Sequence, residues 1–323
     1  QERDSGAPLV RPALDHPPLF SLIPGAFHLL SGQKIYDLPS QVAIRLPMVL
    51  IGTFNVLLFA LLTHRLTDKK TAFLVSLLFA SSPLVVASSR LVVADNLLAS
   101  LVLIVALLFT LKKPPLLLLM LASALAILLK VQGAFLGAGI ALYFFAEKKY
   151  QSTAMIFASM FLAMGMFALY GAYFNGDLFM AIFAEQSSRA IGLTTLLHRF
   201  FFYPSLAAEI WPTAEKSILF ILAISVVIQN HKDKFFQLVG SILIAYLVVA
   251  LAAFDETNIN GWYEYALFPL LFICAIPVIK FILENVSKVA IWLLWLLFSL
   301  PLLKMLAVNL EQLEPFTPLT RKL

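Results

Sequence analysis

Long apolar runs alternate with short clusters of charged residues along most of this chain. Between Val42 and Val308 the runs follow one another almost without pause, and the charged clusters recur at about one membrane thickness. An apolar helix of about 20 residues crosses the hydrocarbon core of a bilayer and satisfies its own backbone polar groups there. The pattern therefore predicts an all-α, polytopic transmembrane helix bundle of about 10 spans. The predicted spans are Val42–Leu62, Thr71–Ser88, Asn96–Leu111, Pro114–Leu129, Val131–Ala146, Ser152–Phe174, Ser217–Ile228, Phe235–Phe254, Ala266–Leu283 and Val289–Val308.

The apolar stretch from Pro114 to Ala146 is predicted to form two spans. As one helix it would be about 50 Å long, which is more than a single crossing requires. The polar sequence Lys130-Val131-Gln132-Gly133 lies at its midpoint, so we expect a tight turn there. The short span Ser217–Ile228 leaves open an earlier start, beyond the break at Trp211–Pro212.

Lys and Arg residues are concentrated in every second loop, which sets the predicted orientation. Short loops rich in these residues remain in the cytoplasm, so the intervening loops face outward. The cytoplasmic loops carry Arg65, Lys69, Lys70, Lys112, Lys113, Lys148, Lys149, Lys232, Lys234, Lys280 and Lys288.

This orientation divides the chain into a first outward segment, a transmembrane domain and a tail. The three parts are residues 1–41, 42–308 and 309–323, and the later outward loops are residues 88–96, 175–216 and 255–265. Because an outward segment precedes the first span, we expect one further span upstream of Gln1. Leu19–Leu30 is amphipathic and is expected to lie along the membrane surface as a short helix.

Composition and charge narrow the function classes. The chain is 61% hydrophobic and only 13% charged. A soluble protein of this length would carry more charged residues, so the composition indicates a membrane protein. The net charge of +5 comes from the cytoplasmic loops, so it is a topology signal and predicts no nucleic-acid partner. Cys274 is the single cysteine and lies in a span, which excludes a disulfide within the chain.

The first outward segment contains the sequence Leu14-Asp15-His16-Pro17-Pro18. Two prolines fix the backbone and hold an acid and an imidazole near the membrane surface. One interpretation is a site for an anionic headgroup, in which His16 contacts phosphate oxygens. The alternative is a proline-stiffened loop in which Asp15 and His16 are only solvated.

Two further outward turns carry charges at the ends of spans. One of these turns carries Arg90, Asp95 and Asn96 at the predicted outer membrane boundary. Charges at such a boundary are costly to desolvate and are often functional. They can equally form an ion pair or an N-cap for the next helix. Lys130 and Gln132 lie in the next outward turn, where the alternative is a lysine that snorkels from a helix end.

The last outward turn, Asp255–Tyr265, combines acids and amides with aromatic side chains. Such a set suits a carbohydrate, because sugar rings stack on aromatic faces while carboxylates and amides bind hydroxyl groups. The alternative is an aromatic belt beside a solvated acidic turn. The candidate substrate-binding residues here are Asp255, Glu256, Trp262, Tyr263 and Glu264.

Taken in order, these motifs resemble the GT-C superfamily of polyprenyl-phosphate-dependent glycosyltransferases. Specifically, they resemble the bacterial and archaeal relatives of dolichyl-phosphate-mannose–protein mannosyltransferases and of the aminoarabinose transferase. The motifs are Asp15-His16-Pro17-Pro18-Leu19, Arg45-Leu46-Pro47, Ser81-Ser82-Pro83, Arg90 through Asp95-Asn96, Lys130-Val131-Gln132-Gly133, Gly261-Trp262-Tyr263 and Phe268-Pro269. They cover nearly the whole chain, and their order relative to the spans carries the match.

The resemblance implies roles for particular residues. Asp95 matches an acid near the family's catalytic site, while the position of the presumed base Asp falls upstream of Gln1. His16, Arg90 and Lys130 are the implied contacts of the donor phosphate. The implied substrate-binding residues are Asp15, Asn96, Gln132, Asp255, Glu256, Trp262, Tyr263 and Glu264. Glu264 departs from the family, because relatives often carry a basic residue there.

The resulting hypothesis is a membrane hexosyl- or pentosyltransferase. It would move a sugar from a polyprenyl-phosphate donor to a hydroxyl acceptor at the outer face of the cytoplasmic membrane, by inverting attack with a carboxylate base. The sequence demands no cofactor and leaves a divalent cation open. The alternative is a transporter or flippase for a lipid-linked sugar, which would place polar groups at the bilayer midplane rather than on one face.

Overall fold

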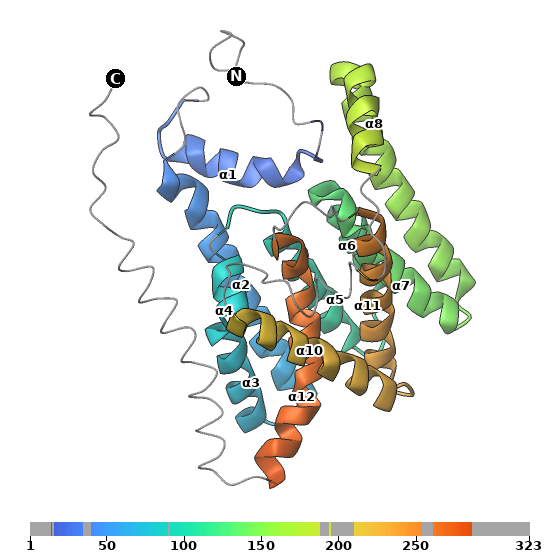
Figure 1. Ribbon diagram of the computed structural model, residues 1–323. Helices are drawn as coiled ribbons and strands as arrows, with labels where there is room; N and C mark the ends of the chain where they lie inside the picture. Colours follow the sequence, from blue (N-terminus) through green and yellow to red (C-terminus); the bar gives the residue numbers. More distant parts are fainter. Residues whose placement is uncertain are drawn as a thin grey trace, which may run out of the picture.

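The computed structural model describes residues 14, 16–34, 40–89, 91–187, 194, 210–253 and 261–285, and every statement below concerns these residues. They form α-helices and short 3₁₀ helices, as the apolar pattern predicts (Figure 1). The elements are α1 (Leu19–Leu30), α2 (Gln41–Leu66), α3 (Lys69–Ser81), α4 (Pro83–Ser88), α5 (Asp95–Phe109), α6 (Leu116–Leu129), η1 (Val131–Gly133), α7 (Ala134–Ala146), α8 (Tyr150–Ser187), α10 (Ile210–Gln229), α11 (Lys234–Ala253), η2 (Gly261–Leu267) and α12 (Phe268–Asn285).

Each predicted span from Val42 to Leu283 coincides with helix, and Val289–Val308 lies outside the described residues. Within the described ranges, four helices are long and apolar enough to cross a membrane, and five further helices are shorter and apolar. The four are Gln41–Leu66, Tyr150–Gln186, Lys234–Ala252 and Glu264–Asn285. The all-α polytopic fold is therefore confirmed, with several spans shorter than a full crossing.

Two boundaries differ from the sequence prediction. Thr71–Ser88 is two helices, because Ser82 is extended (φ −61°, ψ 127°), a conformation that the following Pro83 favours. The segment predicted as outward from residue 175 begins with helix, since α8 continues to Ser187 beyond a kink at Asn175, directly after the predicted span Ser152–Phe174. The Asn175 side chain accepts a hydrogen bond from the Leu178 backbone N–H at 3.0 Å and so restarts the helix.

The start of α10 is also earlier than the predicted span. The helix begins at Ile210 and contains Trp211 and Pro212, so the segment predicted as a loop up to Lys216 ends in helix. Proline is tolerated in the first turn of a helix, where its missing N–H would have no helical partner. The earlier start brings Lys216 onto the helix that enters the bundle.

Helix α1 lies across one end of the bundle, as expected for an amphipathic surface helix (Figure 1). Leu22, Leu29 and Leu30 are exposed on it. His28 is buried and ties the end of α1 to the following loop, with Nε2 2.7 Å from the Lys34 carbonyl oxygen and Nδ1 3.0 Å from Gln33 Oε1.

Away from α1, an aromatic cluster joins three helices in the centre of the bundle. The rings of Phe59 in α2 and Phe79 in α3 stack with centroids 4.1 Å apart, and Phe272 in α12 meets Phe79 edge-on at 5.2 Å. Such pairs add to the burial of apolar area. The cluster fixes α12, and with it the 3₁₀ helix η2 that immediately precedes α12, against α2 and α3.

Candidate active site

Asp95 and Lys130 form a buried ion pair between the start of α5 and the end of α6. The Lys130 Nζ lies 2.7 Å from Asp95 Oδ2, and each residue is only 3% exposed. The capping alternative for Asp95 is wrong, because Ala94 is the N-cap residue of α5 and Asp95 lies in the first turn. The snorkelling alternative for Lys130 is also wrong, since its ammonium group points to a buried carboxylate.

The turn that carries Lys130 is built by its neighbours. Lys130 is extended (φ −165°, ψ 133°), which ends α6, and its carbonyl oxygen accepts a hydrogen bond from the Gly133 N–H at 2.7 Å. A Cβ added at Gly133 would collide with the Ala126 carbonyl oxygen. Glycine therefore lets η1 fold back over the end of α6 and direct Lys130 toward α5.

Asn96 stabilises the turn before α5. Its Nδ2 donates hydrogen bonds to the carbonyl oxygens of Ser88 and Leu91, both at 2.8 Å, so both amide hydrogens are used. Asn55 of α2 donates to the Asn96 carbonyl oxygen at 3.0 Å and accepts from Ser100 at 2.6 Å. These contacts fix the start of α5, on which Asp95 lies.

A second buried ion pair links α10 to η2. Lys216 Nζ lies 2.9 Å from Glu264 Oε2, and the two residues are 0% and 1% exposed. Sequence analysis named Glu264 as a site residue and missed Lys216. The available signal was a lysine directly ahead of an apolar run, at the outer end of a predicted span.

Tyr265 follows Glu264 directly in η2. It is 2% exposed, and its hydroxyl has no hydrogen-bond partner among the described residues. The carboxylates of Asp95 and Glu264 both act electrostatically on this hydroxyl. We call Asp95, Lys130, Lys216 and Glu264 the charge quartet. These four charges come from four separate elements.

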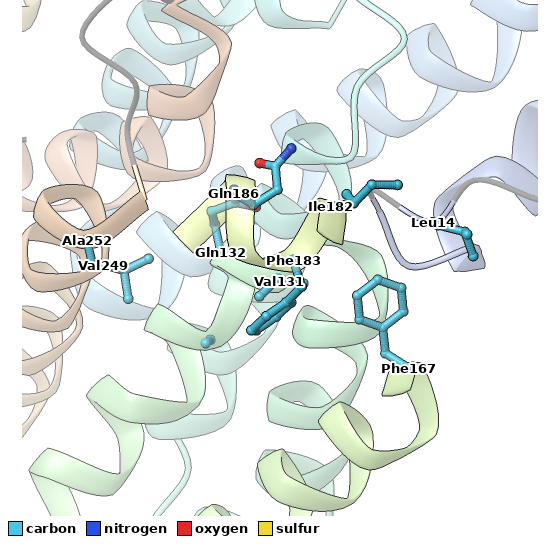
Figure 2. Close-up of a pocket in the computed structure, with 10 residues that line it drawn as sticks. Leu14, Val131, Gln132, Phe167, Ile182, Phe183, Gln186, Val249 and Ala252 are labelled. Atoms are coloured by element: carbon cyan, nitrogen blue, oxygen red, sulfur yellow. The ribbon is translucent and has the colours of Figure 1, made fainter. Parts of the chain in front are cut away.

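An apolar cavity of about 250 Å³ adjoins the Lys130 turn (Figure 2). Its polar side chains are Gln132 of η1 and Gln186 near the end of α8, and the rest of its lining is apolar. Leu14, which precedes the Asp15-His16 motif, also borders it. The remaining lining residues are Val131, Ala134, Phe167, Ile182, Phe183, Val249 and Ala252.

The other predicted site residues stand as follows. His16 is exposed just before α1. Asp15, Arg90, Asp255 and Glu256 lie outside the described residues. Trp262 and Tyr263 belong to η2, but their side chains are not described. Of the candidates, the structure thus brings together Asp95, Lys130 and Glu264, with Gln132 at the adjoining cavity. Among the described residues, no group of three or more His, Cys, Asp or Glu side chains is placed to hold a metal ion.

Comparisons with known proteins agree with this architecture. The family model of dolichyl-phosphate-mannose-protein mannosyltransferases matches residues 15–173. The crystal structure of ArnT from Cupriavidus metallidurans in the apo state is similar with a TM-score of 0.58 and 15% sequence identity. That match covers 85% of this chain and 50% of the ArnT chain, so this chain spans about half the length of that protein. No curated protein matches the chain.

The family match and the shared fold confirm the resemblance drawn from the motifs. The chain is a multi-pass membrane protein that matches the protein mannosyltransferase family model over residues 15–173, just under half of its length. In fold it is similar to ArnT.

Proposed function

We propose that this chain transfers a sugar from a polyprenyl-phosphate donor to a hydroxyl acceptor. The acceptor hydroxyl attacks the anomeric carbon with inversion, a carboxylate accepts its proton, and the lipid phosphate leaves as a stable anion. Cations near the phosphate stabilise the charge that develops on the leaving group. The observation that carries the proposal is the buried Asp95–Lys130 pair beside an apolar cavity.

The ion pair suits the sugar-phosphate head of such a donor, and the apolar cavity suits its prenyl chain. Lys130 offers an ammonium group to the phosphate, and Asp95 offers a carboxylate to the acceptor or the sugar. Val131 and Gln132, which follow Lys130 directly, line the apolar cavity of about 250 Å³. Part of a prenyl chain would fill this cavity, while Gln132 would contact polar groups near its mouth.

Further contacts of the donor and acceptor come from the outward turns. We propose that His16 and Arg90 approach the phosphate from the first two turns. Asp15, Asp255, Glu256, Trp262 and Tyr263 would bind sugar or acceptor hydroxyls. Asn96, whose side-chain amide is fully engaged with the backbone, contributes by positioning Asp95.

We propose that the site opens on the outer face of the cytoplasmic membrane. The quartet gathers where α5 and α12 begin and α6 ends, at helix ends away from the Lys-rich loops. A flippase would instead need polar groups at the bilayer midplane, between discontinuous helices. The gathering of charges at one end of the helices favours the transferase.

The test is donor cleavage by the full-length protein in membrane vesicles. Prenyl-phosphate mannose and prenyl-phosphate aminoarabinose serve as donors, and released prenyl phosphate is measured together with glycosylated product. We expect release with at least one donor, reduced about 100-fold in Asp95→Asn, which removes the charge but keeps a hydrogen-bonding oxygen. Translocation of intact donor without release would support the flippase and overturn the proposal.

A further inference from the structure

Asn55 is a buried polar residue in the interior of an apolar span. It lies near the middle of α2, a helix of 26 residues, and is 6% exposed. An amide is costly to desolvate inside a bilayer, so polar side chains within spans are paired and often functional. Neither the sequence motifs nor the proposed contacts of donor and acceptor include Asn55. Its presence in the span therefore requires an explanation of its own.

The Asn55 side chain joins α2 to the first turn of α5. Its Nδ2 donates a hydrogen bond to the Asn96 carbonyl oxygen at 3.0 Å, and its Oδ1 accepts one from the Ser100 hydroxyl at 2.6 Å. A carbonyl oxygen is only an acceptor, so the nitrogen of the amide must face Asn96. Asp95 directly precedes Asn96, so the amide holds α5 one residue away from the carboxylate of the buried ion pair.

The space beside Asn55 is too small for a substrate group. Asn55, Asn96 and Tyr265 border a cavity of about 20 Å³. That volume holds about one water molecule. A sugar or a prenyl phosphate is far larger, so Asn55 can affect transfer only through the residues that it holds in place.

Stability alone explains these contacts poorly. Hydrogen bonds between helices in a membrane add little net stability, and a leucine of similar shape would suit the apolar surroundings of Asn55. Loss of the amide would still leave the Ser100 hydroxyl an acceptor, because it also lies 3.3 Å from the Asn96 carbonyl oxygen. The amide alone supplies a fixed position of the start of α5 relative to α2.

We propose that Asn55 is a positioning residue for the transfer reaction. It holds the Asn96 carbonyl oxygen, and through the backbone it fixes where the Asp95 carboxylate meets Lys130 and the reacting groups. A misplacement of about 1 Å at a reacting centre can cost roughly 100-fold in rate. This inference rests on the proposed function, because it requires that Asp95 take part in transfer.

The experiment compares Asn55→Leu with Thr63→Val in the full-length protein in membrane vesicles. Release of prenyl phosphate is measured with the donor that the wild type cleaves, prenyl-phosphate mannose or prenyl-phosphate aminoarabinose. We expect Asn55→Leu to lower kcat by roughly 10- to 100-fold, while the KM for the donor and the melting temperature in detergent stay near those of the wild type.

Thr63→Val is the matched control for the loss of a hydrogen bond between helices. The Thr63 hydroxyl lies 3.0 Å from the Ser76 hydroxyl of α3, in the other half of the same helix α2. Ser76 keeps the Ala72 carbonyl oxygen as an acceptor at 2.7 Å, so this variant also leaves it with a partner. Thr63→Val should transfer sugar at the wild-type rate.

The double variant Asn55→Leu/Asp95→Asn shows whether Asn55 acts through Asp95. If it does, the double variant transfers no more slowly than Asp95→Asn alone, because the carboxylate that Asn55 positions is already gone. A further loss as large as that of Asn55→Leu alone would place its effect elsewhere and overturn the role.

The remaining outcomes separate this role from the proposed function. Transfer at the wild-type rate by folded Asn55→Leu overturns the positioning role and leaves the transferase intact, and so does an equal loss in Thr63→Val. If the wild type releases prenyl phosphate from neither donor, the transferase proposal fails and the positioning role fails with it. If Asn55→Leu does not fold, Asn55→Ala, which introduces no larger side chain, is measured with the same expectations.

Discussion

Charges at the two ends of the helices are held in different ways. At the end where α5 begins and α6 ends, the quartet joins elements that are distant in sequence, and its members are buried. At the opposite ends, the described ion pairs are exposed and mostly local. Lys280 and Glu284 are one helical turn apart at 4.0 Å, and Asp68 caps its own helix. The buried set therefore connects distant helices, whereas most of the exposed set lies within one helix or turn, with Lys234–Glu147 as the described exception.

This difference between buried and exposed ion pairs indicates which charges are not explained by stability. Exposed ion pairs contribute about 0 to 1 kcal/mol to stability. A buried pair gains little over apolar side chains of the same volume, yet breaking it is costly. The quartet is thus poorly explained by stability alone, which supports the site that we propose at this end.

The largest expected effect comes from breaking the Asp95–Lys130 pair. Lys130→Met leaves the Asp95 carboxylate buried without its ammonium partner, so we expect a loss of about 3–5 kcal/mol in the free energy of unfolding. The matched change Lys280→Met at an exposed pair should shift it by less than about 1 kcal/mol. Thermal unfolding in detergent, followed by fluorescence, measures both.

The double variant Asp95→Asn/Lys130→Met separates stability from function. Removing both charges restores most of the stability, because no unpaired charge remains. Transfer should stay at the level of the inactive single variants. A double variant that regains transfer would show that the Asp95–Lys130 pair has only a structural role. The buried charges would then not differ in function from the exposed ones.

A smaller effect is expected from the backbone that directs Lys130. Gly133→Ala places a Cβ against the Ala126 carbonyl oxygen and the Leu98 side chain, so the turn must shift, at a cost of about 1–3 kcal/mol. Gly165→Ala in α8 is the control, because nothing lies within 4 Å of the added Cβ. There alanine should be neutral or stabilising by up to about 1 kcal/mol.

The rate of sugar transfer is the second measurement for the Gly133→Ala and Gly165→Ala variants. If Gly133 only shapes the turn for packing, activity should fall no further than stability does. If it aims Lys130 at the donor, transfer should fall even at temperatures where the variant is fully folded. An unchanged melting temperature and activity in Gly133→Ala would contradict the role assigned to the turn.

Local sequence signals explain most of the fold. The bounds of α1 and the turn at Lys130 follow from amphipathicity and from a polar midpoint in an overlong apolar run. The continuation of α8 could not be read, because Asn175, Gly176 and Asp177 suggest a loop and only the capping bond from Leu178 reveals a new helix start.

The candidate site was predictable residue by residue but not as a set of partners. Asp95, Lys130 and Glu264 stand out as charges at span ends, yet nothing local assigns Lys130 to Asp95 or Lys216 to Glu264. Each pair is joined across long sequence separations by helix packing. Lys216 was missed because it lies in a segment interpreted as a loop, where a lysine is expected to be solvated.

The smallest effect concerns Asp68, at the start of α3. The Thr71 hydroxyl donates a hydrogen bond to Asp68 Oδ2 at 2.6 Å, and the Thr71 and Lys70 N–H groups donate to Oδ1 at 3.0 Å each. These bonds, led by that from the Thr71 side chain, lower the pKa of Asp68 from 3.8 to about 2. Because the folded-state pKa is the lower one, the stabilisation is complete above about pH 4 and is lost as the pH falls through about 2.

Asp68→Asn provides the comparison for this pH dependence. Asparagine is nearly as good an N-cap as aspartate but does not titrate, so the variant should unfold with a flatter acid dependence. The measurement is the melting temperature in detergent from about pH 5 to about pH 2, taken as the difference between wild type and variant. We expect the two proteins to converge toward the acid end, where protonated Asp68 loses its charge. Parallel profiles over the whole range would mean that Asp68 does not stabilise α3 through its charge, and that the exposed end has no such local role.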